Sequence, residues 1–145
     1  DYLYKARPHK ISIAKFKAKV KRLTSRRWGV SMNVRLSKLR YLFRGWYNYF
    51  KNDKMKSFAK AIDSNTRFRL RMCIWKQWKK VKTKQKALIK LGISKSKAWE
   101  WANTRKGYAR VASSFIMQRS VTNALLKRKG FLTMESLLPK PKQFI

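Results

Sequence analysis

A basic stretch from Arg67 to Lys84 contains the side chains whose types and spacing are best suited to a chemical function. No acidic residue lies between Asp63 and Glu100. On a helix, Arg67 and Arg71 would lie on one face, where two like charges repel each other. One interpretation is a solvated face over an apolar core, but such faces normally mix both signs of charge, so we favour binding of a polyanion. The candidate phosphate-binding side chains are Arg67, Arg69, Arg71, Lys76, Lys79, Lys80, Lys82 and Lys84.

Two shorter segments carry similar residues. Arg26 and Arg27 precede a Trp-Gly pair at a predicted helix end, where cations also suit the helix dipole, so a structural role is slightly favoured there. Residues 103–110 form a predicted turn that combines amide, hydroxyl, cationic and aromatic side chains. Such side chains can bind phosphates and stack on bases of RNA or DNA, but an ordinary basic turn fits equally well. Its candidate residues are Asn103, Thr104, Arg105, Lys106, Tyr108 and Arg110.

The charge balance indicates the partner. The chain has 145 residues, with 39 Lys and Arg against 5 Asp and Glu, and a net charge of +34. Such self-repulsion destabilises a folded chain unless a partner screens it, and nucleic acid is the expected partner. An anionic membrane surface is a weaker alternative, because the aromatic residues are spread over the whole chain rather than along one amphipathic helix.

The same composition argues against an active site, a metal centre or a membrane span. One Cys and one His exclude an internal disulfide and a Cys–His metal cluster. The five carboxylates are widely spaced and no glycine-rich phosphate loop occurs, so we expect no catalytic residues, no metal and no cofactor in this chain. The longest charge-free stretch, Val111 to Gln118, is too short to cross a membrane, which favours a cytoplasmic protein.

Apolar residues recur at helical spacing through most of the chain and predict an all-α fold. Pro8 disfavours helix before it, so residues 1–10 are expected to be extended. Gly45 in mid-helix suggests close approach of another backbone or of a phosphate. We expect a bundle of longer helices over residues 1–81, a smaller basic helical region over 82–138 and a tail at 139–145. The longer predicted helices span 12–26, 31–51 and a third from a cap at Asn52 or Asp53 to a break at 81–83, with Leu70, Cys73 and Ile74 facing inward. The shorter ones span 83–91, ended by Gly92, and 94–102, then one from a cap at Ser113 or Ser114 through Leu126 to an end at Lys129–Gly130, and a last turn at 134–138 capped by Thr133.

Short motifs in a fixed order run from about Arg7 to Leu126. They are Arg7-Pro8-His9, Leu23-Thr24-Ser25-Arg26, Trp28-Gly29-Val30, Arg44-Gly45-Trp46, Met55-Lys56-Ser57-Phe58, the specific run Arg69 to Lys80, Lys90-Leu91-Gly92-Ile93 and Asn103 to Tyr108. Together they resemble the maturase-specific region of group II intron reverse transcriptases. Arg44, within one of these motifs, joins the candidate RNA-binding residues.

The resemblance implies the thumb (X, or maturase) domain of an intron-encoded protein, followed by a small DNA-binding region. Such a domain binds group II intron RNA to promote splicing and contacts template–primer or target DNA during retrohoming. Fingers and palm domains of the same protein would lie upstream, and the palm would hold the Mg²⁺-binding Tyr-Ala-Asp-Asp motif. That motif is absent here, so this chain alone is not expected to polymerise. Mg²⁺ is expected only in that palm and in the RNA.

The resemblance also implies a setting, a bacterial ribonucleoprotein particle, and leaves two other functions open. One alternative is a polymerase thumb that acts mainly in reverse transcription. The other is a generic basic nucleic-acid-binding module, which would not prefer intron RNA. The chain begins at Asp1 rather than Met, which fits either a piece of a larger protein or a processed or trimmed one.

Overall fold

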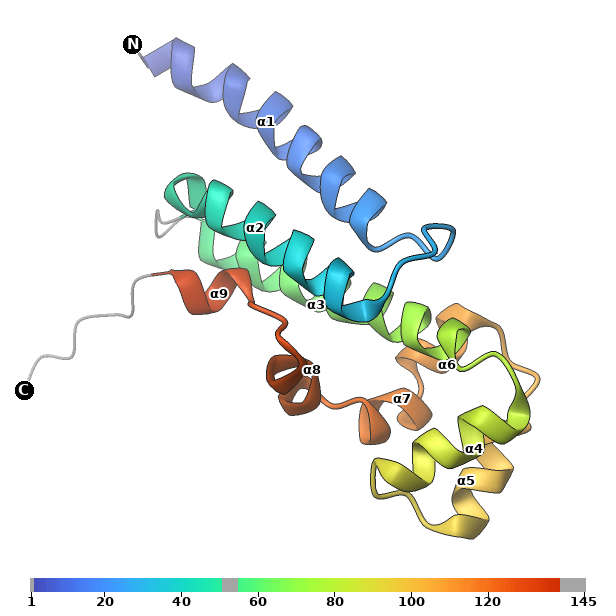
Figure 1. Ribbon diagram of the computed structural model, residues 1–145. Coiled ribbons are helices and arrows are strands. Elements are labelled where there is room, and N and C mark those ends of the chain that lie inside the picture. The colour runs from blue at the N-terminus through green and yellow to red at the C-terminus, as the bar shows by residue number, and fades with distance from the viewer. Residues whose placement is uncertain (1, 51–54, 139–145) are drawn as a thin grey trace, which may run out of the picture.

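The computed structural model describes residues 2–50 and 55–138, and within them it contains helices and no strand, which confirms the all-α prediction (Figure 1). Three long helices come first and shorter ones follow. Their bounds are α1 Tyr2–Leu23, α2 Met32–Phe50, α3 Lys56–Gln77, α4 Val81–Lys90, α5 Lys95–Ala102, α6 Tyr108–Ser113, α7 Phe115–Ser120, α8 Asn123–Lys129 and α9 Met134–Leu137.

Helix α3 is the central element of the described chain. It packs against α2, α6 and α9, while α1 packs on α2, and α4 and α5 form a helical hairpin at one end (Figure 1). Buried side chains from all these helices belong to one hydrophobic cluster, which includes Phe16, Leu70, Leu88 and Met117. Helix α9 returns to α2 and α3, so the segment after residue 82 shares the core of the segment before it. The division at residue 81 stays a prediction.

The helix α1 begins at Tyr2, so the expectation of an extended opening is wrong. A proline inside a helix removes one backbone donor and crowds the carbonyl four residues before it, but the preference that it imposes on the preceding residue is a bias and not a bar, and α1 includes Pro8. The predicted second helix is confirmed as α2, whose Ser31 hydroxyl accepts a hydrogen bond from the Val34 N–H at 3.3 Å. The predicted caps Asn52 and Asp53 lie outside the described residues.

The break after α3 lies earlier than expected. It falls at Trp78–Lys80, and Val81 to Thr83 are already helical. Lys79 adopts a left-handed φ of 50°, and the Lys80 N–H closes a tight turn on the Trp78 carbonyl at 2.7 Å. The predicted glycine stop at Gly92 is confirmed. Its φ is 98°, and the N–H of Ile93 donates to the Leu88 carbonyl at 3.0 Å, as at many glycine-ended helices.

The single helix predicted from Ser113 or Ser114 to Lys129–Gly130 is two helices, α7 and α8, although its predicted end is confirmed by the end of α8 at Lys129. The carbonyl of Val121 accepts a hydrogen bond from the Arg71 side chain instead of continuing the helical ladder. Thr122 then starts α8, because its hydroxyl accepts from the Leu125 N–H at 3.1 Å. Helix α6 was not expected. The cap at Ser114 is confirmed, with its hydroxyl accepting from Ile116 N–H at 3.2 Å.

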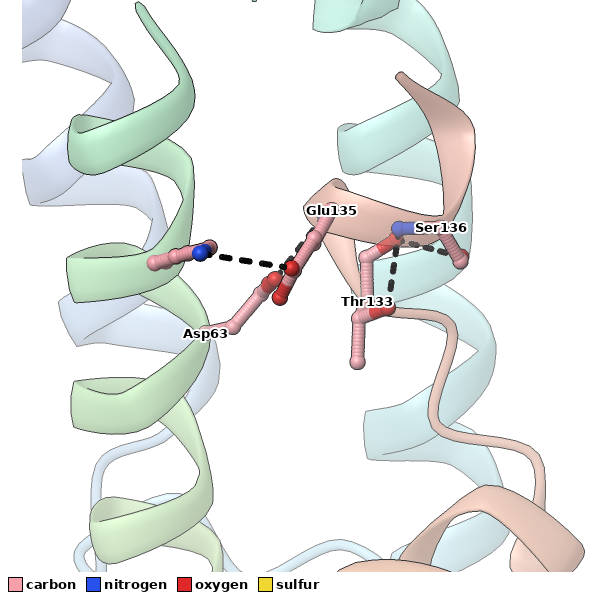
Figure 2. Close-up of polar contacts among 5 residues, drawn as sticks. Asp63, Thr133, Glu135 and Ser136 are labelled. Carbon is pink, nitrogen blue, oxygen red and sulfur yellow. Dashed lines mark hydrogen bonds and ion pairs between the residues drawn. The ribbon is translucent and has the colours of Figure 1, made fainter. Parts of the chain in front are cut away.

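A buried carboxylate joins α3 to the start of α9. Figure 2 shows Asp63 pointing at the first turn of α9, where its two oxygens accept from the N–H groups of Met134 at 2.7 Å and Glu135 at 2.9 Å. The predicted cap Thr133 is confirmed, since its hydroxyl accepts from the Ser136 N–H at 3.1 Å. Three N–H groups that the short helix cannot satisfy internally are therefore paired.

Candidate nucleic-acid interface

The second half of α3 holds the α1–α2 loop (residues 24–31) in place. Arg69 donates from Nε to the Thr24 hydroxyl at 2.7 Å and from Nη2 to the Lys21 carbonyl at 3.1 Å. Lys76 donates from Nζ to the Arg26 carbonyl at 2.9 Å. The candidate phosphate-binding residues Arg69 and Lys76 therefore donate hydrogen bonds to the protein itself, and these bonds position the loop that carries Arg26.

Arg35 supports the same loop from the other side, and the sequence analysis missed it. It is 2% exposed, and its guanidinium donates to the carbonyls of Leu23 at 2.6 Å, Ser25 at 2.9 Å and Trp28 at 2.7 Å. Its Nε has no hydrogen-bond partner. The sequence signal that could have identified Arg35 is its position four residues before Leu39, on the apolar stripe of α2. A cation at a core position of a helix indicates a buried hydrogen-bonding role.

Arg71 is also a structural residue. It is 4% exposed, and it donates from Nε to the Val121 carbonyl at 2.8 Å and from Nη2 to Asn123 Oδ1 at 2.7 Å. Burial, and next the charge of Arg67, lower the pKa of its guanidinium. The repulsion expected between these two arginines is therefore present. Carbonyl and amide oxygens of α7–α8, rather than a polyanion, meet the guanidinium of Arg71.

The remaining candidates on this stretch lie toward solvent. Arg67 is half-buried and lines a polar cleft of about 620 Å³ with Arg71 and Asn123. Lys84 lies over the Trp75 ring at 4.4 Å, and burial lowers its pKa. The exposed cations are Lys79, Lys80 and Lys82. The apolar residues expected inward, Leu70, Cys73 and Ile74, are buried, and burial raises the pKa of the Cys73 thiol.

Gly45 does not mark a close approach of backbone. A Cβ placed there would meet no atom within 4 Å, so the expected close approach of another backbone is wrong. The expected approach of a phosphate stays a prediction. The neighbouring Arg44 is exposed on α2.

The α1–α2 loop and the start of α6 meet. The Arg26 guanidinium lies 4.6 Å from the centre of the Tyr108 ring, which is 38% exposed, so two of the three candidate segments are adjacent. Beneath the loop is a hollow of about 290 Å³, which we call the loop hollow. Its lining contains four cations and no acid, and is made of Thr24, Ser25, Arg26, Arg27, Arg69, Met72 and Lys76.

The segment 103–110 divides into a turn and an exposed part. Asn103 donates from Nδ2 to the Trp99 carbonyl at 2.8 Å, and the Thr104 hydroxyl accepts from the Lys106 N–H at 3.3 Å. Both polar candidates therefore help to form the turn. The three cations of the segment, Arg105, Lys106 and Arg110, are exposed.

The described ranges 2–50 and 55–138 show neither a metal centre nor a membrane-spanning helix. These ranges contain no group of three or more His, Cys, Asp or Glu side chains that could hold a metal ion. No helix in them is long and apolar enough to cross a membrane.

The described residues form an α-helical domain with a basic hollow whose lining holds no acid. Residues 13–92 match the family model described as "Group II intron, maturase-specific domain". The match covers more than half of the chain, from α1 to the glycine that ends α4, and the chain belongs to this family. A search of curated proteins gave no match. Residues 93–126, which the sequence resemblance included, lie outside the matched range.

Proposed function

We propose that this chain binds group II intron RNA and promotes its splicing, and that it contacts template–primer or target DNA during retrohoming. Membership of the maturase-specific family supports association with intron RNA in general. The net charge of +34 supplies the long-range attraction that a polyanion needs.

The observation that carries the proposal is the loop hollow. Four cations surround it without an acidic neighbour, and three elements of the described chain converge on its loop: Arg35 on α2, Arg69 and Lys76 on α3, and Tyr108 at the start of α6. A prepositioned cluster of cations can read the spacing of phosphates on a folded RNA, because it does not have to be ordered on binding.

The candidate cations have different proposed roles. Arg26, Arg27, Lys79 and Lys80 are exposed and are proposed to contact phosphates. Arg69 and Arg71 are proposed to position the surface, because their guanidinium groups already donate to protein oxygens.

We also propose that the chain carries no polymerase chemistry of its own. Its place would be in a ribonucleoprotein particle, with Mg²⁺ held by the RNA and by a palm domain of the same protein. A primer-extension assay of this chain with Mg²⁺ should give no product, and extension by the purified chain would contradict this part of the proposal.

A filter-binding comparison tests the main proposal. The chain is titrated with a group II intron RNA and with an unrelated structured RNA of the same length, at several salt concentrations. A preference for the intron RNA that persists at high salt supports the proposal. Equal affinities with equal, steep salt slopes would show phosphate neutralisation alone and would contradict it.

A pair of variants with matched charge loss locates the surface. Arg26→Ala/Arg27→Ala removes two exposed cations that line the loop hollow, and Arg128→Ala/Lys127→Ala removes two exposed cations on α8. The first pair should lower affinity for intron RNA about tenfold and reduce the salt slope by about 1 to 2, since each phosphate contact contributes a little under one. The second pair should have a clearly smaller effect. Equal effects would contradict the assignment to this surface.

A further inference from the structure

A second hollow lies at the other end of the described chain, between α5 and α7. Its volume is about 440 Å³, and most of its lining follows the range that matches the family. We call it the Phe115 pocket. It is lined by Gly92, Ile93, Ser94, Lys97, Trp101, Phe115 and Arg119.

Two aromatic rings form an apolar wall of this pocket. Phe115 and Trp101 meet edge to face, with ring centres 5.3 Å apart. Trp101 is 7% exposed, so it anchors the pair in the core, whereas Phe115 is 50% exposed. Apolar area of Phe115 therefore remains in water, and an aromatic ring supported by a second ring beside a hollow is suited to stacking.

Cations surround the exposed ring. Lys106 Nζ lies 5.9 Å from its centre and Arg119 Cζ lies 6.0 Å from it. Lys97, also in the lining, is 3.9 Å from Glu100 in an exposed ion pair. The ion pairs among the described residues use Lys60 and Lys97, which leaves the charges of Lys106 and Arg119 available to an anion.

We propose that the Phe115 pocket binds one unpaired nucleotide of a single-stranded nucleic acid. The base would stack on Phe115, and the adjacent phosphates would contact Lys106 and Arg119. An aromatic ring flanked by cations matches a nucleotide, which offers a π face and a negative charge a few ångströms apart. This deepens the proposed function, on which it rests, by adding a base contact to phosphate contacts made elsewhere.

A base-deletion experiment on the full chain tests the proposal. Fluorescence anisotropy measures binding of a short oligouridylate and of an abasic backbone of the same length and charge. The parent chain should bind the oligouridylate more tightly, and Phe115→Ala should remove most of that advantage, a loss of about fivefold or more, because stacking is the interaction removed. The salt slope should not change, since no charge is lost.

Trp99→Ala is the matched control. Trp99 is an aromatic on α5 that is 61% exposed and does not line the pocket. It should keep the preference for the base-bearing strand, as should Phe115→Trp, which retains a stacking surface. Circular dichroism checks that each variant is folded. The proposal is overturned if Phe115→Ala keeps the preference for the base, or if Trp99→Ala loses it to the same extent.

Two further arms separate this proposal from the proposed function. The affinities for DNA and RNA oligonucleotides of one sequence show whether the 2′-hydroxyl contributes to binding. Tighter binding of one of them identifies the kind of strand that the pocket prefers. The filter-binding test above concerns preference for folded intron RNA. That preference can be absent while the base-dependent binding at Phe115 remains. If the preference for intron RNA is present and the base-dependent binding is absent, only the proposal for the Phe115 pocket is overturned.

Discussion

The junction of α3 with the α1–α2 loop and the region around Phe115 are both rich in cations, yet they hold them in opposite ways. At the junction, the guanidinium groups of Arg35, Arg69 and Arg71 donate to carbonyl, hydroxyl and amide oxygens of the protein. Around Phe115, the charged groups of Lys106 and Arg119 lie beside an exposed ring. The first arrangement uses the donors to shape the fold, and the second places cations beside a partly exposed ring, where we propose that a nucleotide binds.

The difference shows that a count of cations overstates a binding surface. Arginine has five donors in a planar fork, so one buried side chain can satisfy several loop carbonyls at once. In a chain with 5 acidic residues, backbone oxygens become the main internal partners of arginine. Arg69 and Arg71 therefore look like phosphate ligands in the sequence, while in the structure their donors face the protein.

Of the variants proposed here, a substitution of Arg35 should cause the largest loss of stability. Arg35→Met keeps much of the side-chain volume but leaves the carbonyls of Leu23, Ser25 and Trp28 without their donor, and we expect the free energy of unfolding to fall by about 3 kcal/mol. Urea denaturation measures it. Arg40→Met is the control on the same helix, because exposed Arg40 makes one hydrogen bond, to the Gly130 carbonyl at 3.2 Å, and should cost less than about 1 kcal/mol. Similar losses for both variants would mean that Arg35 is not a structural residue.

A comparison of Arg71 with Arg67 sharpens the distinction within one helix face. Arg71→Met should lower the free energy of unfolding by about 2 kcal/mol, since the Val121 carbonyl and Asn123 lose their donor. Arg67→Met removes the same charge from a half-buried site, and should cost less than about 1 kcal/mol but lower the salt slope of RNA binding. Urea denaturation and filter binding measure the two effects. The reverse pattern would show that Arg71 faces the RNA.

The contact of Asp63 with α9 gives a smaller, pH-dependent effect. Burial raises the pKa of the Asp63 carboxyl above its ordinary value of 3.8, although the N–H groups of Glu135 and Met134 and the charge of Arg67 act in the opposite direction. The folded chain therefore holds this proton more tightly than the unfolded chain. The resulting contribution to stability is complete below pH 3.8 and is lost as the pH rises through the raised pKa.

Denaturation of the parent and of Asp63→Asn across this pH range measures that contribution. The variant loses one acceptor for the α9 N–H groups and should be less stable by about 1–2 kcal/mol at low pH, with the difference shrinking as the pH rises. Glu135→Gln is the control, because it removes an exposed carboxylate 4.0 Å from Lys60 at the same contact. A difference between parent and Asp63→Asn that grows with pH would contradict the prediction.

Much of the helix order could be predicted because its signals are local. The apolar spacing that predicts α2, the glycine that ends α4 and the hydroxyl caps at Ser114 and Thr133 each act within a few residues. The errors arise where a distant contact decides. The break between α7 and α8 depends on Arg71, fifty residues away along the chain. Thr122 supplies a local cap for α8, but the partner of the Val121 carbonyl cannot be read from the neighbouring residues.

The candidate site divides in the same way. Composition and motif order alone established a basic, all-helical member of the maturase-specific family, because net charge, apolar period and short motifs do not depend on how the chain folds back on itself. Packing alone decided which cations remain available. Burial and hydrogen bonding assign Arg35 and Arg71 to the interior, and they bring Arg26 against Tyr108 and leave Phe115 in solvent. Exposure is a property of the whole fold, since it depends on which segments pack over a residue.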